Sequence, residues 1–290
     1  MDFDRFLDQA WTDHAEQPAA VAERLAEPGL ALLQQEDQVP PLAALALHVH
    51  GQHLARWAEG LAFQQRLAAL PLVAAGSTTA AALQRNAAVL QLAGGLADVR
   101  AGLPASEATR ITAMTAAALG EHDPARGRQL LEEATAAVET HALPDADPAV
   151  RALAVAGNNL AAALEERPAR SEAERALMIL AAQTGRAFWA RAGTWLETER
   201  AEYRLARTWL QAGDAAQARH HARLCLDLVQ AHDNLPLERF FGLEALALAQ
   251  RAAGDAAACA ATVLQLRAAF DALDEGDQGW CRPTLDSFKA

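Results

Sequence analysis

Two glycine–aspartate pairs constrain how this chain can fold. Gly213-Asp214 and Gly254-Asp255 each lie between two apolar segments that are long enough to form helices. Glycine and aspartate both favour turns, so each pair is predicted to separate one helix from the next. The sequence therefore predicts that its C-terminal half is built from pairs of adjacent helices.

The composition extends this expectation to the whole chain. Hydrophobic residues make up 52% of the 290 residues but aromatic residues only 5%, so alanine and leucine supply most of the apolar content. Both are among the strongest helix formers. Tyrosine occurs once, and valine and isoleucine, which favour strands, are sparse. We therefore expect an all-α protein.

Proline, glycine and capping residues divide the rest of the chain into further helical segments. Near the start, helices are expected over residues 3–14 and 18–35, with a break at Pro28-Gly29. From residue 105 the segments become more regular, and Ser106 and Ser171 are expected to cap helices. We expect degenerate helical hairpins over residues 1–104, helical repeats over 105–275 and an irregular tail over 276–290, in one continuous domain.

The two Gly-Asp turns share a local pattern with a known repeat family. Leu205-Ala206 precedes Trp209 and the first turn, and Ala218 follows it. Leu246-Ala247 likewise precedes the second turn, and Cys259 follows it. The pattern resembles the tetratricopeptide repeat, which has Leu-Gly and then an aromatic residue in its first helix and a small residue in its second. The second unit lacks the aromatic residue, and the units are longer than the roughly 34 residues of the standard repeat.

The resemblance implies an α-solenoid, a right-handed superhelix of about six antiparallel helical hairpins. Small side chains at Ala161, Ala206, Ala218 and Ala247 would let neighbouring helices approach closely. Because each hairpin leaves one apolar face open, several hairpins must stack to form a stable array.

In proteins of this family, the first helices of the hairpins line a concave groove that binds peptides or protein segments. By position, the resemblance implies a groove lined by Asn158, Arg200, Tyr203, Arg207, Glu244 and Arg251. The guanidinium group of arginine donates paired hydrogen bonds to carboxylates. The resemblance therefore implies a non-enzymatic scaffold or adaptor that binds a protein or peptide and has no cofactor.

Other interpretations of the same residues remain open. Arg200 and Arg207 could pair with acidic residues on their own helix and form a solvated face; these are Glu197, Glu199 and Glu202. The groove could instead hold a small peptide or a metabolite, as the sensor part of a regulatory system. A third interpretation is a metal-binding or enzymatic protein on a helical-repeat frame, although the common phosphate-loop and hydrolase motifs do not occur. Glu165-Glu166 is most simply interpreted as a solvated helix end.

Histidine and cysteine residues raise the question of a metal site, since both residue types bind zinc. His50 and His53 could share a helical face, whereas His48 is expected to point elsewhere. His221 and Cys225 lie four residues apart, also on one face. No third ligand at helical spacing completes either pair, so no metal site is predicted.

Charge and cysteine content exclude several function classes. A net charge of −12 opposes contact with phosphate backbones, so no nucleic-acid partner is expected. Three unevenly spaced cysteines indicate a reducing compartment rather than a disulfide framework. The N-terminus lacks a signal segment, and the longest nearly uncharged stretch, residues 67–83, is broken by Pro71 and Gly76. We therefore expect a soluble, cytoplasmic protein with no membrane partner.

The last hairpin suggests a surface for self-association. A terminal repeat exposes an apolar face unless something covers it, so Leu264, Phe270 and Trp280 could pack against a second copy of the chain. Tryptophans elsewhere are expected to pack between helices, as large aromatic residues usually do; these are Trp57, Trp189, Trp195 and Trp209.

Overall fold

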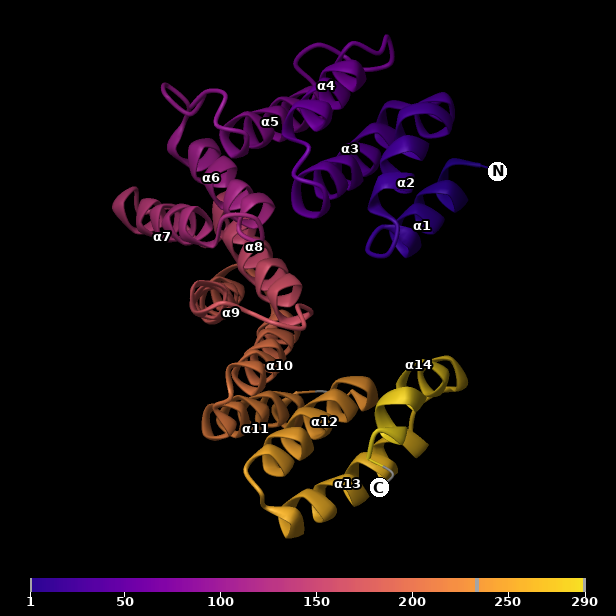
Figure 1. The fold of residues 1–290 in the computed structure, drawn as a ribbon, viewed down its shortest axis with the longest axis vertical. Coiled ribbons are helices and arrows are strands. Elements are labelled where there is room, and N and C mark those ends of the chain that lie inside the picture. Colours follow the sequence, from indigo (N-terminus) through magenta and orange to yellow (C-terminus); the bar gives the residue numbers. More distant parts are fainter. Residues whose placement is uncertain (1, 233–234, 289–290) are drawn as a thin grey trace. The chain divides into compact units, whose positions relative to one another are not determined.

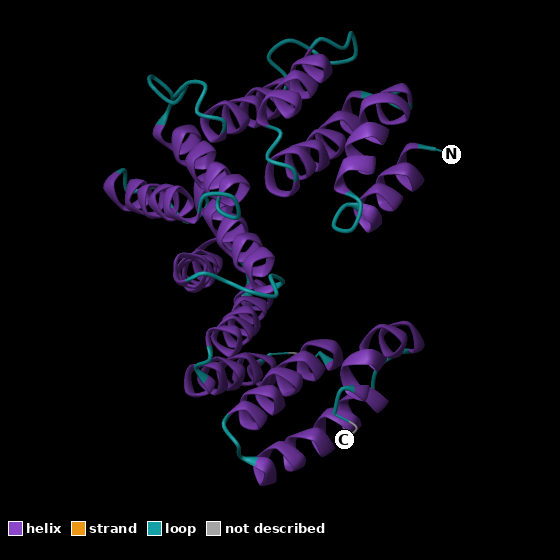
Figure 2. Ribbon diagram, viewed as in Figure 1, coloured by secondary structure: helices purple, strands orange, loops and turns teal. Residues whose placement is uncertain are grey.

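The computed structural model describes residues 2–232 and 235–288, and these residues form helices and no β-strand (Figure 2). The predicted all-α fold is therefore confirmed. The α-helices, labelled in Figure 1, are α1 (Phe3–Asp13), α2 (Pro18–Arg24), α3 (Val39–Leu47), α4 (Trp57–Ala68), α5 (Thr78–Ala93), α6 (Ala105–Leu119), α7 (Pro124–Thr140), α8 (Pro148–Glu165), α9 (Glu172–Ala192), α10 (Trp195–Ala212), α11 (Ala215–Ala231), α12 (Pro236–Ala252), α13 (Ala256–Asp271) and α14 (Glu275–Asp286). Two π-helical turns, η1 (Leu25–Gly29) and η3 (His48–His53), and one 3-10 turn, η2 (Glu36–Gln38), lie among the first helices.

The chain divides into two compact units. The N-terminal unit, Met1–Leu143, contains α1 to α7, and the C-terminal unit, Pro144–Ala290, contains α8 to α14. The segment boundaries at residues 104 and 275, expected from the sequence, stay predictions.

The N-terminal unit has its main apolar core between its first helices. Large side chains from α1, η1, α3, α4 and α5 are fully buried there; they are Phe6, Leu25, Leu42, Leu45, Leu67 and Leu83. A smaller cluster joins α5 to α6 through Val89 and Ile111, with Trp57 packed against it. The second helix is shorter than expected, because α2 ends at Arg24 and continues as the π-helical turn η1, which contains Pro28.

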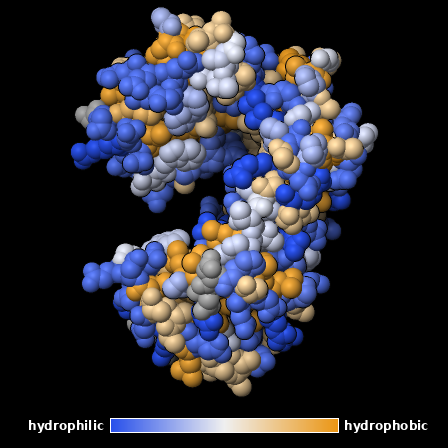
Figure 3. All heavy atoms as spheres, turned by 180° about the vertical axis from the view of Figure 1, so that it is seen from behind, coloured by the Kyte–Doolittle hydropathy of each residue, from blue (hydrophilic) through white to orange (hydrophobic). Residues whose placement is uncertain are grey.

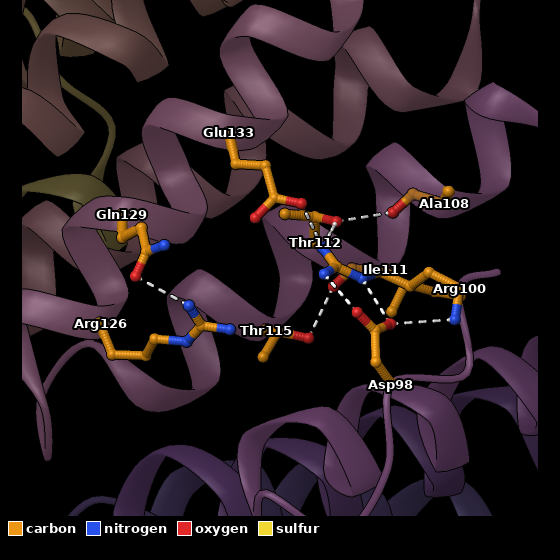
Figure 4. Close-up of polar contacts among 9 residues, drawn as sticks. All are labelled: Asp98, Arg100, Ala108, Ile111, Thr112, Thr115, Arg126, Gln129 and Glu133. Atoms are coloured by element: carbon orange, nitrogen blue, oxygen red, sulfur yellow. Dashed lines mark hydrogen bonds and ion pairs between the residues drawn. The ribbon is translucent and has the colours of Figure 1, made fainter.

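Arg100 lies in the loop between α5 and α6 and forms hydrogen bonds with residues of α6 and α7 (Figure 4). Its guanidinium group donates to both carboxylate oxygens of Asp98, at 2.8 and 2.7 Å, and to the Thr112 hydroxyl of α6 at 2.7 Å. It also donates to Glu133 of α7 at 2.6 Å. Hydrogen bonds from Arg100 lower the pKa of Asp98 to about 2. One arginine therefore holds a loop without secondary structure against two helices.

Consecutive helices of the C-terminal unit pack side by side. α9 packs against both α8 and α10, α11 against both α10 and α12, and α13 against both α12 and α14, while α10 also contacts α12 directly. The two Gly-Asp turns lie where the sequence predicted them. Gly213 and Gly254 have φ angles of +85° and +74°, which few other residues adopt, and Asp214 and Asp255 cap α11 and α13.

Small residues allow these helices to approach closely. Ala161, Ala206, Ala218 and Ala247 are fully buried, in agreement with the packing role expected for them. The backbones of α8 and α9 meet most closely at Gly157, where a Cβ atom would lie only 2.6 Å from the Ala181 carbonyl oxygen of α9. The helix crossing at this point therefore depends on the absence of a side chain.

The end of the chain differs from the expected irregular tail. Asp274 caps helix α14 by accepting from the Asp277 amide, and Cys281 and Leu285 of this helix are buried in a cluster with Phe240 and Phe270. Local capping and this apolar contact explain why the segment is helical. Ser106 was also expected to cap α6, but α6 begins at Ala105, so Ser106 lies within its first turn.

Phe270 is buried and so does not belong to the exposed surface that was suggested for self-association. Leu264 and Trp280 are 67% and 64% exposed, but Phe270 is only 3% exposed and packs against Phe240. The suggestion that Phe270 contributes to an exposed apolar face was therefore wrong. A homodimer through Leu264 and Trp280 stays a prediction.

Polar residues cover most of the face shown in Figure 3, where apolar residues gather only in small groups. Among the described residues, no helix combines the length and the apolar character needed to cross a membrane.

Candidate functional site

The strongest candidate binding surface lies between α10 and α12 of the C-terminal unit. These are the first helices of two consecutive helix pairs, and they contact each other directly. A hollow of about 320 Å³ lies between them and is lined by Arg207, Leu210, Gln211, Leu248, Arg251 and Ala252. We call these six residues the α10–α12 hollow. Two of them, Arg207 and Arg251, belong to the groove that the sequence predicted.

Three of the predicted groove residues form one hydrogen-bonded group beside this hollow. The Tyr203 hydroxyl donates to Oε2 of Glu244 at 2.8 Å, and Nη1 of Arg207 donates to Oε1 of the same carboxylate at 2.6 Å. Burial raises the pKa of Glu244, although Arg207 and Tyr203 favour its charged form. Burial and the Glu244 charge raise the pKa of Tyr203 as well, so its hydroxyl stays a proton donor. The group holds the Arg207 side chain in place at the edge of the hollow.

The other predicted groove residues lie apart from this group. Arg200 of α10 donates to Oε1 of Glu238 in α12, with Nη2 at 2.5 Å. Arg251 stacks over the Phe288 ring at 5.0 Å, and its guanidinium donates to the Ser287 carbonyl. Asn158 lies on α8 near the crossing with α9, where its side chain donates to Asn159. The structure therefore brings Tyr203, Arg207 and Glu244 into direct contact and gives Arg200, Arg251 and Asn158 other partners.

The glutamate partners of the arginines differ from those expected. Arg200 and Arg207 were considered as partners of Glu197, Glu199 and Glu202 on their own helix, but their ion pairs reach across to α12. Glu197 instead completes a capping box with Thr194 at the start of α10. Pairing between helices fixes α10 against α12, which pairing within one helix would not do.

Several glutamate carboxylates are buried between the packed helices of this unit. Five glutamate side chains are between 1% and 8% exposed, namely Glu165, Glu199, Glu202, Glu238 and Glu244. Buried charges are costly unless they are paired, and four of the five accept hydrogen bonds from arginine. Glu165 is one of them: it accepts from Arg204 at 2.7 Å and from Thr208 at 2.5 Å. Its interpretation as a solvated helix end was wrong.

Glu199 is the buried carboxylate without an arginine hydrogen bond. Its Oε1 accepts from the Cys225 thiol at 2.8 Å, while its Oε2 is buried and faces no hydrogen-bond donor. Burial and the neighbouring Glu238 charge raise the pKa of Glu199 to about 8. The raised pKa favours the protonated form of this side chain, in which Oε2 has a hydrogen to donate.

His221 and Cys225, one of the pairs considered for metal binding, are bound to two different glutamates. Nδ1 of His221 donates to Glu202 at 2.7 Å, and the Cys225 thiol donates to Glu199. Burial raises the pKa of the Cys225 thiol, so the thiolate that zinc requires is disfavoured. Both side chains serve the buried hydrogen-bond network of the C-terminal unit.

A separate cluster of histidines lies in the N-terminal unit. Nε2 of His48 and Nε2 of His53, both in η3, are 3.1 Å apart. His14, the residue that follows α1, joins them, so that one nitrogen from each ring lies within 4.8 Å of the other two. We call these three residues the histidine cluster. The sequence was expected to place His48 away from His53, but His48 contacts His53, whereas His50 lies beside the Phe63 ring.

The π-helical turn explains the exchange of partners. In an α-helix, residues four apart share a face, but the wider π-helical turn brings residues five apart together, as it does for His48 and His53. Sequence reasoning missed His14 because its neighbours depend on how α1 packs against α3 and η3. A histidine at a helix end carries no local sign of such a contact.

No family model, curated protein or solved structure matches this chain.

Proposed function

We propose that the protein is a non-enzymatic binding module that holds a peptide segment in the α10–α12 hollow. The observation that carries the proposal is the hollow itself, whose lining combines two arginines, Arg207 and Arg251, with the apolar side chains of Leu210 and Leu248. Guanidinium groups recognise carboxylates, and the leucines offer contact to an apolar side chain. The ligand expected from this chemistry is a protein segment that carries an acidic group next to an apolar residue.

The hollow has room for part of a longer ligand. Pockets for small molecules usually enclose about 300–1,000 Å³, and a volume of about 320 Å³ is at the lower end of that range. A hollow of this size accommodates one or two side chains of a longer segment, whose remainder would lie along α10 and α12.

The proposed function includes a solenoid architecture and a cytoplasmic location. Successive helix pairs, buried small residues and Gly-Asp turns support a solenoid of hairpins similar to tetratricopeptide repeats. The three cysteines are free, which fits the reducing conditions of the cytoplasm.

Binding of acidic peptides tests this function. Fluorescence anisotropy with a library of labelled peptides, each combining an acidic and an apolar residue, should yield saturable binders. Arg251→Ala should weaken the best binder by about 10- to 100-fold, because a hydrogen bond to a charged group contributes about 1.5–3 kcal/mol. Arg207→Lys should weaken it too, since lysine keeps the charge but lacks the fork that contacts a ligand and Glu244 together.

The matched control is Arg223→Ala, which removes the same charge from an exposed position on α11, away from the lining of the hollow. Its affinity should equal that of the wild type. A library without saturable binders, or equal affinities for wild type, Arg251→Ala and Arg207→Lys, would contradict the proposal.

A further inference from the structure

We propose that His14, His48 and His53 form a binding site for a divalent transition-metal ion, with zinc as the first candidate. The site lies wholly in the N-terminal unit and does not depend on the proposed peptide binding. Three imidazole rings converge there, and their side chains are half-buried.

The ring nitrogens converge at distances that suit a shared ion. Two nitrogens that each lie about 2.0–2.1 Å from a tetrahedral zinc ion are roughly 3.3 Å apart. The 3.1 Å between Nε2 of His48 and Nε2 of His53 is close to that value. One nitrogen of His14 lies within 4.8 Å of the nitrogens of the other two rings, so a small rotation of its side chain would bring it to the same ion.

The orientation of His14 is already set by a backbone contact. Its Nδ1 donates to the Trp11 carbonyl oxygen, which leaves Nε2 as the nitrogen with a free lone pair. Histidines that bind metals usually donate their other ring nitrogen to a carbonyl or carboxylate, and this contact fixes the tautomer. Trp11 also lies against the His14 and His48 rings, at centroid distances of 5.1 and 5.5 Å.

The Nε2 atoms of His48 and His53 face each other, so the two rings compete for one hydrogen. Neutral imidazole is the form that binds transition metals. Without an ion, two neutral rings can share only one hydrogen between their Nε2 atoms, so a cation would satisfy both lone pairs.

Three imidazole ligands leave a fourth position free on a tetrahedral ion. All three side chains are half-buried rather than enclosed, so water can reach that position. Three protein ligands with one water molecule is the arrangement of open zinc sites, whereas structural sites use four protein ligands. The η3 turn supplies two of the three ligands, and π-helical turns of this kind occur often at functional sites.

Metal titration of the full-length chain tests the site. The protein is purified through a tag without histidine, stripped with a chelator and titrated with Zn²⁺ by calorimetry. A second titration with Co²⁺ is followed by visible absorption, because a tetrahedral cobalt ion absorbs strongly and reports its ligand geometry on the wild-type protein. We expect one ion per chain and a tetrahedral cobalt spectrum.

Variants assign the ligands. His14→Ala, His48→Ala and His53→Ala should each weaken zinc binding by more than about 100-fold, with folding checked by circular dichroism. The matched control is His122→Ala, which removes a nearby ring whose Nε2 already contacts the Gln52 carbonyl oxygen at 2.7 Å. It should bind zinc like the wild type. Failure of the wild type to saturate at one ion per chain, or undiminished binding by the triple variant His14→Ala/His48→Ala/His53→Ala, would overturn the proposal.

Discussion

Replacement of Gly157 by alanine is expected to lower the free energy of unfolding by about 3 kcal/mol. The added Cβ atom would lie 2.6 Å from both the Ala181 carbonyl oxygen and the Gly185 amide nitrogen of α9. These are backbone atoms, so no side-chain rotation can relieve the clash, and α8 and α9 would have to separate. Alanine favours helices over glycine by up to about 1 kcal/mol, which is too little to offset that separation.

Urea unfolding followed by far-ultraviolet circular dichroism measures this effect. Gly279→Ala is the matched control, because Gly279 lies in α14 and no atom lies within 4 Å of its added Cβ. The control should be neutral or more stable by about 0.5–1 kcal/mol, as expected for glycine to alanine in an open helix. If Gly157→Ala were as stable as its control, the close crossing of α8 and α9 would be wrong.

Stability is expected to fall as the pH rises from about 5 to 8, because of Glu199. The pKa of this carboxyl is about 8 in the folded chain, against an ordinary value of 4.5. Between these two pKa values the folded state holds a proton that the unfolded state has released. Raising the pH in this range therefore lowers the free energy of unfolding. The stabilising contribution of protonated Glu199 is fully present below the pKa of the unfolded state. It is lost as the pH rises through the pKa of the folded state, at up to about 1.4 kcal/mol per pH unit.

Glu199→Gln isolates this effect from the titration of other groups. The amide is neutral at every pH, its oxygen can still accept from Cys225, and its NH₂ group can donate toward Glu238. The free energies of unfolding of variant and wild type should be similar near pH 5, and the variant should be more stable by roughly 3 kcal/mol at pH 8. Urea unfolding across this pH range measures the difference.

The control for Glu199→Gln is Glu166→Gln, the same substitution at an exposed position at the end of α8. It should follow the wild-type pH dependence. A Glu199→Gln variant that also followed it would show that Glu199 is ionised in the folded chain at neutral pH.

The two predictions concern one structural feature, the close packing of polar helices. Glycine at the α8–α9 crossing and alanines between the other helices bring backbones together, and carboxylates then become buried between the helices. Buried carboxylates need partners from neighbouring helices, which ties each helix to the next. The proposed peptide surface depends on this arrangement, because Glu244 holds Arg207 at the edge of the α10–α12 hollow.

The sequence by itself determined the features that depend on short-range interactions. The helical composition, the Gly-Asp turns and the Ser171 cap were all predictable, because each depends on the propensity or hydrogen bonding of residues near one another in the chain. The buried alanines were predictable for a related reason, since small residues recur at fixed places around each turn.

Only the tertiary structure decided which polar residues meet. Helical periodicity places Glu165 and Glu199 among solvated residues, yet Arg204 and Cys225 from neighbouring helices give them buried partners. His14 joins His48 and His53 because α1 packs against α3 and because η3 widens by one residue per turn. Contacts of this kind join residues that are distant in the chain, so no local pattern encodes them, and they arise only when the helices are packed together.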